Sequence, residues 1–504
     1  MKLRLLLGFL AFSTALSAQL NTTLRSNLPY DDSVNDVWGY VAPDGTEYAI
    51  VGLLNGVSFV SLADPDNAVE VARIPGVRSG WRDMKTYRNY AYSVADQQDE
   101  GITAFDLSFL PDSVPFKRTT YDIEGYPAPF VRAHNVYIDT ASAHLFTAGG
   151  DRRSNVGFGR IIVFDLADDP MEPELIALGP DTYAHDVYVQ GDTMYASEIY
   201  QGELAIYDIS DLENITEIGT TRTPFTFTHN AWSTADGLTV FTTDEEPNAP
   251  VAAYDISDPN DIELLDEYRP LSSLNTGTIP HNVHVIDDYL SISYYTDGLR
   301  VVDASQPDNL IEVANYDTWL GPNGDFNGNW GAYPYLPSGL TLLSDRSTGL
   351  YVVDVDYKRA AHLRGVITDI DFGFPINNVD VTVEALEPAD TGTDALGRYR
   401  TGVATGGSYQ VTFTADNYLP LKVNVDFING ETIILDTTLT PNIRRFLNQE
   451  ITVIDDETEA PIPNATVRVF NEDFEYLAAA DVAGTATFDF INEGIYDGFV
   501  AEWG

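Results

Sequence analysis

Short apolar runs that end in a polar residue recur along the first two thirds of the chain. The six copies that end in aspartate cover residues 101–106, 160–165, 203–208, 251–255, 298–303 and 349–354, and a seventh at 56–61 ends in serine. Turn-forming sequences such as Ser-Asp-Pro-Asn at 257–260 follow these runs. A short apolar run bounded by a turn is typical of a buried β-strand. We therefore expect seven equivalent strands.

A second repeated pattern is a pair of polar residues placed before an alternating apolar strand. The pairs are Asn35-Asp36, Arg82-Asp83, His134-Asn135, His185-Asp186, His229-Asn230 and His281-Asn282, and the expected seventh falls at Asn329-Trp330, where the pattern degrades. Successive second members are 44 to 52 residues apart. A near-constant period of this length indicates a repeat protein.

Each repeat contains two further expected strands, one before the aspartate-ending run (for example 194–198) and one after it (for example 262–268). Four short strands in a radially repeated unit form one blade of a β-propeller. The seventh repeat lacks its fourth strand, and residues 20–29 resemble the fourth strands of other repeats. We predict an all-β fold whose first domain, residues 19–358, is a seven-bladed β-propeller. Its N-terminal strand closes the last blade, because closure removes unpaired sheet edges.

The aspartate-ending strands resemble the LVIVD repeat. The region from about Leu20 to Tyr357 resembles the propeller of the choice-of-anchor B family of exported bacterial proteins. This resemblance implies display outside the cell, with a mode of anchoring that differs between members. It implies no established enzymatic activity, and it assigns no catalytic residue.

Two smaller β modules are expected after the propeller. Residues 363–441 combine short strands with Gly- and Asp-containing turns, and they closely resemble the carboxypeptidase regulatory-like domain, a transthyretin-like β-sandwich. This domain accompanies the catalytic domain of metallocarboxypeptidases and does not itself cleave, so the resemblance implies no peptidase activity. A second copy is expected over 446–504. Because it halts at Gly504 while a strand is still running, we expect this module to be truncated.

The N-terminus has the pattern of a secretory signal peptide. Lys2 and Arg4 precede an apolar stretch at 5–16, and the small residues Ser17 and Ala18 precede Gln19. The stretch is too short to cross a bilayer, which takes about 20 residues. We expect residues 1–18 to be removed and the mature protein to be extracellular, either secreted or anchored at the cell surface, without a transmembrane segment.

The amino-acid composition excludes several kinds of site and partner. The sequence has no cysteine, which excludes disulfides, thiolate metal sites, a cysteine nucleophile and a lipid anchor on cysteine. The formal net charge is −50, which excludes nucleic acid as a partner because phosphate binding needs a basic surface. The acidity has two interpretations, solubility in salty surroundings and cation binding. We expect a monomer.

The polar pairs supply the candidate site, because equivalent positions in successive blades form a ring. The candidate ligand-binding residues at this mouth of the central channel are Asp36, Asp83, His134, His185, Asp186, His229 and His281. Adjacent residues of a strand point to opposite faces, so only one member of each pair can face the channel. The other can bond backbone groups where two blades meet.

Two interpretations of the histidines remain open. If they are structural, each imidazole bonds a backbone group, and repeat symmetry alone favours this. If they form a site, His134, His185, His229 and His281 are the metal candidates, because imidazole suits a divalent cation as cofactor. His281 and His284 form an H-x-x-H, but positions i and i+3 of a strand face opposite sides. A weaker candidate is the D-x-N-x-N formed by Asp325, Asn327 and Asn329, which lacks the later glutamate of a calcium loop.

The sequence favours a non-catalytic interaction protein that uses the propeller as a binding platform for an extracellular protein, peptide or glycan. Repeat regularity is explained without chemistry, and no nucleophile–base set, H-E-x-x-H or G-x-S-x-G is present. Aromatic residues at a propeller mouth can stack on sugars or peptides, although they more often belong to the core. The alternative is an extracellular metal-assisted hydrolase or lyase with its site at the channel mouth.

Overall fold

The computed structural model describes residues 19–150, 159–385, 389–442, 446–471, 474–492 and 497–501. Within these ranges the chain forms strands β1 to β41 and two short 3-10 helices, η1 (Leu107–Phe109) and η2 (Leu271–Ser273). The predicted all-β class is confirmed. The expected leader at 1–18 lies outside the described residues. No helix among the described residues is long and apolar enough to cross a membrane.

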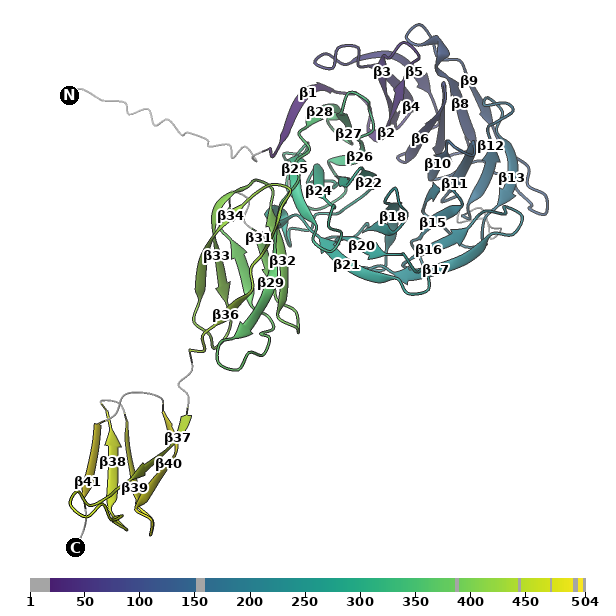
Figure 1. Cartoon of the computed structure of the whole chain (residues 1–504). Helices are drawn as coiled ribbons and strands as arrows, with labels where there is room; N and C mark the ends of the chain where they lie inside the picture. The colour runs from purple at the N-terminus through teal and green to yellow at the C-terminus, as the bar shows by residue number, and fades with distance from the viewer. Residues whose placement is uncertain are drawn as a thin grey trace, which may run out of the picture.

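Seven four-stranded antiparallel sheets are arranged as propeller blades around a central channel (Figure 1). The first, inner strands are β2 (Val34–Val41), β6 (Arg82–Tyr87), β10 (Asn135–Asp139), β14 (Asp186–Gln190), β18 (Thr228–Ser233), β22 (Val283–Ile286) and β26 (Asn329–Tyr333). The second strands are β3 (Glu47–Leu53), β7 (Tyr90–Ala95), β11 (His144–Ala148), β15 (Thr193–Glu198), β19 (Thr239–Asp244), β23 (Tyr289–Ser293) and β27 (Leu340–Asp345).

The aspartate-ending runs form the third strand of each blade. These strands are β4 (Gly56–Ser61), β8 (Ile102–Asp106), β12 (Ile162–Asp165), β16 (Glu203–Asp208), β20 (Val251–Asp255), β24 (Leu299–Asp303) and β28 (Gly349–Val355). The outer strands are β5 (Val69–Pro75), β9 (Phe116–Thr119), β13 (Glu174–Leu178), β17 (Thr216–Arg222), β21 (Glu263–Tyr268), β25 (Ile311–Tyr316) and, in the seventh blade, β1 (Thr22–Leu28). The seventh sheet has the order β1-β28-β27-β26, so the N-terminal strand lies on the outside of the last blade, with Thr22 opposite Val355.

The repeated aspartate has a local structural role. Its side chain accepts a hydrogen bond from the backbone N–H two residues later, at 3.0 Å for Asp106 and Ser108 and at 2.9 Å for Asp208 and Ser210. Such a bond closes the turn into the outer strand. In the first blade the serine hydroxyl of Ser61 accepts from Ala63 N at 3.4 Å, which explains why serine is tolerated there.

Two modules follow the propeller. In the first, β32 (Arg398–Val403), β29 (Ala361–Asp369), β35 (Thr432–Ile434) and β36 (Thr437–Leu439) form one sheet, and β31 (Ala389–Gly392), β30 (Asp380–Val383), β33 (Gly407–Thr414) and β34 (Leu421–Phe427) form the other. The two sheets enclose a buried core that includes Leu363, Val381, Val411 and Phe413. The second module consists of β37 (Phe446–Thr452), β38 (Thr466–Phe470), β39 (Glu475–Ala479), β40 (Thr485–Asn492) and β41 (Asp497–Ala501), in sheets β37-β40 and β39-β38-β41.

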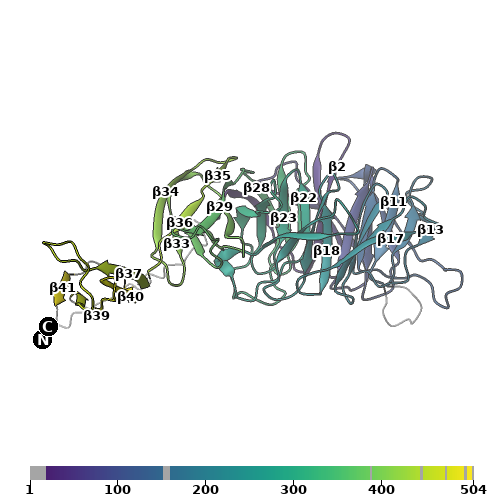
Figure 2. The same cartoon turned by 60° about the horizontal axis from the view of Figure 1, so that its bottom comes forward.

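The first module packs against the sixth blade (Figures 1 and 2). Asp308 accepts hydrogen bonds from Arg364 (3.2 Å) and Arg400 (2.9 Å). Asn309 donates to the main-chain oxygen of Thr401 at 3.0 Å. This contact lies at the rim of the propeller, so it leaves the channel mouth open.

Candidate functional site at the propeller mouth

Four histidines from blades three to six lie side by side at one mouth of the channel. The ring centroids are 4.1 Å apart for His134 and His185, 4.3 Å for His185 and His229, and 4.4 Å for His229 and His281. The structure therefore brings together the four histidines that the repeat pattern singled out.

Three of these histidines are positioned by the same kind of backbone hydrogen bond. The backbone N–H of His134 donates to Ala148 O at 2.9 Å, that of His185 to Ser197 O at 2.8 Å, and that of His281 to Ser293 O at 2.9 Å. Each acceptor belongs to the second strand of the same blade. Next to Ala148, Gly149 has a positive φ of 71°, and a Cβ there would lie 2.5 Å from the Cβ of His134. Glycine is required at this position for the chain to pass the imidazole.

The second members of the pairs join neighbouring blades. Asp83 Oδ2 accepts from Asn135 Nδ2 and from the backbone N–H of Val136, both at 2.9 Å. Asn135 Oδ1 in turn accepts from the N–H of Val187 at 3.1 Å, one blade further on. Asn230 Oδ1 accepts from the N–H of Val283 at 3.0 Å. These side chains satisfy backbone amides at the start of the next inner strand, which is a structural role.

Asp36 and Asp83 line a small cavity together with His134, His229 and His281, and they do not line the larger pocket at the mouth. Asp36 accepts from the N–H of Val37 at 2.8 Å, and Lys85 Nζ lies 2.6 Å from Asp83 and 4.0 Å from Asp36. Burial and the neighbouring charge of Asp83 raise the pKa of Asp36. In blade two the first member of the pair, Arg82, forms a fully buried ion pair with Glu100 at 2.6 Å. At the position of the polar pairs, blades one and two thus contribute carboxylates and a buried ion pair, and blades three to six contribute imidazoles.

The imidazoles do not share one hydrogen-bonding role. His281 Nδ1 donates to the main-chain oxygen of Trp330 at 2.7 Å, as the structural interpretation expects. His134 Nδ1 instead bonds Asp96 Oδ2 at 3.1 Å, and His185 Nδ1 bonds Asp186 Oδ1 at 2.9 Å. His229 Nδ1 is buried and has no hydrogen-bond partner among the described residues. The condition set by the structural interpretation, a backbone bond for each imidazole, is therefore met by His281 and not by His134 or His185, where a carboxylate occupies Nδ1.

Burial determines the charge of the cluster. It lowers the pKa of His185 to about 4, with the neighbouring histidines adding to the effect, and it lowers that of His229 to about 4. Burial also holds the pKa of His281 well below the ordinary value. At His134 burial is outweighed by the hydrogen bond and charge of Asp96, so its pKa is raised. The cluster at neutral pH consequently consists mainly of neutral imidazoles, the form that binds metals.

Glu245 completes the cluster, and the pair pattern did not reveal it. Its Oε1 atom accepts from the hydroxyl of Tyr295 at 2.6 Å and lies 3.9 Å from the Nε2 atoms of both His229 and His281. Burial raises the pKa of Glu245. Burial thus favours the protonated form of this carboxyl group, relative to an exposed glutamate.

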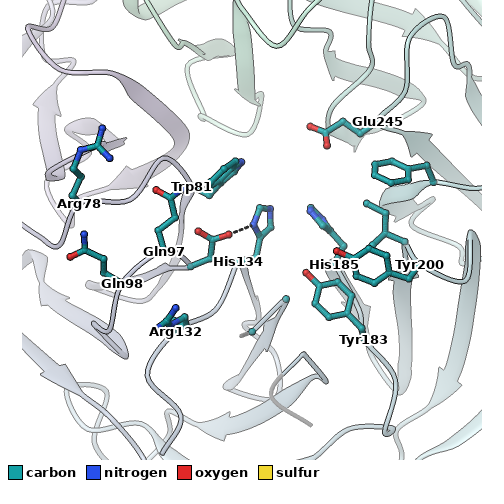
Figure 3. Close-up of a pocket in the computed structure, with 15 residues that line it drawn as sticks. Arg78, Trp81, Gln97, Gln98, Arg132, His134, Tyr183, His185, Tyr200 and Glu245 are labelled. Atoms are coloured by element: carbon teal, nitrogen blue, oxygen red, sulfur yellow. Dashed lines mark hydrogen bonds and ion pairs between the residues drawn. The ribbon is translucent and has the colours of Figure 1, made fainter. Parts of the chain in front are cut away.

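A pocket of about 600 Å³ opens above His134 and His185 (Figure 3). Its walls come from the loops that enter the first strand and leave the second strand of blades two to five. They include Arg78, Trp81, Gln97, Gln98, Arg132, Tyr183, Tyr200, Phe227 and Glu245. Tyr183 and Tyr200 have ring centroids 4.8 Å apart on one side, and Trp81 lies on the other (Figure 3). The pocket thus combines aromatic walls with a floor of imidazoles and carboxylates.

Two overlapping groups in the cluster have metal-ligand spacing. One ligand atom from each of His134, His185, Asp186 and His229 lies within 4.8 Å of the others, and the same holds for His229, Glu245 and His281. A second, smaller cavity of about 20 Å³ lies beneath the pocket. It is lined by His134, Asp186, His229 and His281 together with Asp36, Arg82, Asp83, Asn135, Asn282 and Trp330.

The other motifs lie elsewhere. His284 contacts Trp38, Trp232 and Tyr335 at ring-centroid distances of 4.7 to 6.0 Å and belongs to neither group, in keeping with the strand geometry expected for H-x-x-H. Asp325 is exposed and accepts from the N–H of Phe326, whereas Asn329 is fully buried at the start of β26. Asn327, between them, is half-buried. Asp325 is not a member of either group of metal-ligating residues.

Several pocket residues were missed because they lie in loops of unequal length. Asp96 and Glu245 nevertheless follow directly on the second strands β7 and β19 of their blades. Aligning the repeats on the second strand, instead of on the polar pair, could have revealed Asp96 and Glu245.

Comparisons with known proteins identify parts of the chain. The LVIVD repeat matches residues 181–223 and 280–318, which contain all four strands of blades four and six. The carboxypeptidase regulatory-like domain matches residues 362–440, the first module after the propeller. No curated protein matches the chain. The chain therefore contains LVIVD repeats and a carboxypeptidase regulatory-like domain.

Proposed function

We propose that this chain is an extracellular binding protein whose propeller takes its ligand in the mouth pocket, while the β modules act as spacers. The single observation that carries this proposal is the pocket of about 600 Å³ on blades two to five. Pockets of this size accommodate small molecules or short segments of larger ligands.

The lining favours a ligand with both flat apolar faces and many hydroxyl or amide groups. Tyr200 is 51% exposed and Trp81 is 37% exposed, so both rings offer stacking surfaces. Gln97 and Gln98 add amide groups, and Arg78 adds a positive charge at the rim. This combination suits a sugar residue of a glycan, with a peptide as the second possibility.

Display outside the cell is part of the same proposal. The apolar leader at 1–18 supports export, and the resemblance to choice-of-anchor B proteins supports secretion or surface anchoring. The test is a glycan and peptide binding screen on the full chain, followed by the variants Tyr200→Ala and Trp81→Ala. We expect binding that both variants weaken at least tenfold, with Leu320→Ala, a 91% exposed residue outside the pocket, as the matched control. Equal binding by all three variants would refute the pocket as the ligand site.

A second candidate function is metal-assisted hydrolysis or elimination at the same mouth. It is favoured by Glu245, a carboxyl group with a raised pKa placed 3.9 Å from His229 Nε2. A bound divalent metal ion would supply an activated water or a polarised carbonyl, and Glu245 would take up the proton. Turnover of an ester or glycan panel that is lost in Glu245→Gln would support this function over simple binding.

A further inference from the structure

The row of imidazoles contains one member that is not available to a ligand. His281 uses Nδ1 to donate to Trp330 O, and its Nε2 accepts from the indole N–H of the same tryptophan. Both nitrogens are thus occupied by one residue of the seventh blade. The remaining three histidines differ from His281 in this respect.

The rings of His134 and His185 are each held by a carboxylate that bonds the Nδ1 atom. In each, Nδ1 faces a carboxylate, Asp96 or Asp186, which leaves Nε2 directed away from that carboxylate. A carboxylate behind the imidazole is the usual outer-shell arrangement of metal-binding histidines, because it selects the tautomer and holds the ring. The two side chains are only 13% and 12% exposed, so neither swings freely in solvent.

His229 supplies the third group. Its side chain is 2% exposed, and Nδ1 has no hydrogen-bond partner among the described residues. A buried polar atom without a partner is uncommon in native proteins and calls for an unseen partner such as an ion or water. The cavity of about 20 Å³ next to His229 has room for one such particle, since about 10–15 Å³ is enough to hold a water.

We propose that His134, His185 and His229 bind one divalent transition-metal ion at the floor of the mouth pocket. Three neutral nitrogen ligands suit Zn²⁺ and related first-row ions, and they do not suit Ca²⁺ or Mg²⁺. Asp186 lies within the same 4.8 Å group, but its two oxygens already accept from His185 and Asn230. We assign it to holding His185 and to balancing the charge of the ion.

The spacing is close to what coordination requires. Two nitrogen ligands of a tetrahedral zinc ion lie about 3.4 Å apart, since each bond is about 2.1 Å long. The ligand atoms here lie within 4.8 Å of one another, so each ring needs to move inward by at most about 0.8 Å to coordinate one ion. The ion would keep an open position toward the pocket, because His134 and His185 line the pocket as well as the cluster. This inference rests on the proposed function in taking the mouth pocket as the entrance.

The test is a zinc titration of the full chain after treatment with a chelator. Excess Mg²⁺ is kept in the buffer to occupy the many surface carboxylates. We expect about one zinc ion per chain, and at least tenfold weaker binding in His134→Ala, His185→Ala and His229→Ala. The matched control is His144→Ala, a histidine at the start of β11 that belongs to neither group, and it should bind zinc as the wild type does. Asp96→Asn should weaken binding about 10- to 100-fold through loss of the outer-shell bond.

A second measurement uses the wild-type chain, so its result does not depend on whether a variant folds. X-ray absorption of the zinc-loaded wild-type chain should show about three imidazole ligands. No zinc retention, or a zinc ion with at most one imidazole, would overturn the proposal. The glycan and peptide screen, repeated on chelated and zinc-loaded chain, separates the two proposals. If the chain binds zinc but no glycan or peptide, the metal site is supported and the binding function is refuted. If it binds a glycan or peptide but no zinc, the binding function is supported and the metal site is refuted.

Discussion

His281 and Trp330 hold each other through two hydrogen bonds. His281 Nδ1 donates to Trp330 O at 2.7 Å, and the Trp330 indole N–H donates to His281 Nε2. Trp330 occupies the place where the seventh copy of the polar pair degrades, so the loss of the pattern in one blade fixes the histidine of the neighbouring blade. Because this contact occupies both ring nitrogens of His281, His229 is the last histidine of the row that can bind a ligand or a metal ion.

The first prediction follows from that contact. Replacing His281 with Ala should lower the free energy of unfolding by about 1–3 kcal/mol, because the buried indole N–H and the carbonyl of Trp330 lose their partner. Zinc binding should persist, in contrast to His229→Ala. Denaturant unfolding together with zinc titration of both variants checks this. Loss of zinc from His281→Ala with unchanged stability would reverse the assignment of the two histidines.

The second prediction concerns the bonds between blades. Asn135→Ala removes the partner of Asp83 and of the N–H of Val187, and it should lower the free energy of unfolding by about 1–3 kcal/mol. The matched control is Asn260→Ala, which removes a similar amide–carboxylate bond to Asp258 at 3.0 Å in an exposed turn. That change should stay within about 0.5 kcal/mol. Urea unfolding of both variants is the measurement, and equal effects would contradict the structural role of Asn135.

The third prediction concerns ring closure. Deleting residues 20–29 removes β1 and leaves β28 as an open sheet edge, so the propeller should unfold at a clearly lower temperature. Removal of residues 446–504, which include the strands of the second module, serves as the control and should leave the propeller transition unchanged. Hydrogen exchange should show faster exchange in β28 after the first deletion only. A propeller transition that is unaffected by loss of β1 would show that closure does not depend on it.

The fourth prediction concerns pH and His284. Burial, followed by the positive charge of Lys85, lowers the pKa of His284 from 6.5 to about 3. Between these two values the unfolded chain binds a proton that the folded chain does not, so stability is complete above pH 6.5 and falls as the pH falls toward 3. Relative to wild type, His284→Phe should remove a slope of about 1.4 kcal/mol per pH unit below about pH 6. Urea unfolding between pH 5 and 8 measures the difference, and parallel profiles for the two proteins would refute it.

The fifth prediction concerns modularity. Residues 361–441 contain both sheets and a complete buried core, so this fragment should fold alone. The polar contact of Asp308 with Arg364 and Arg400 is partly exposed and should contribute only about 0–1 kcal/mol. Asp308→Ala in the full chain should therefore leave the unfolding of both domains nearly unchanged. A fragment without a dispersed amide spectrum would show that the propeller is needed for the module to fold.

The sequence by itself determined the architecture. Four strands per repeat and a period of 44 to 52 residues specify propeller blades, because a repeat with one pattern of turns and apolar runs can bury its faces only against copies of itself. The aspartate that ends six of the seven repeated runs was visible as a pattern, and the bond of Asp106 and Asp208 to the backbone two residues later is local. The pairs could also be placed near one mouth, since equivalent positions form a ring.

Only the tertiary structure decided what each polar residue does. Asn135 and His134 are neighbours in sequence, but one binds the next blade and the other faces the pocket, because adjacent strand residues point in opposite directions. Four histidines occupy one repeat position, yet their partners differ: Asp96 follows a second strand, Asp186 is the next residue in sequence, and Trp330 lies at the pair position of another blade. Glu245 reaches the cluster from the loop that follows β19. A repeat pattern predicts where the backbone of each residue lies. The hydrogen-bonding partners of a side chain depend instead on which loops lie next to it, and these loops come together only when the ring closes.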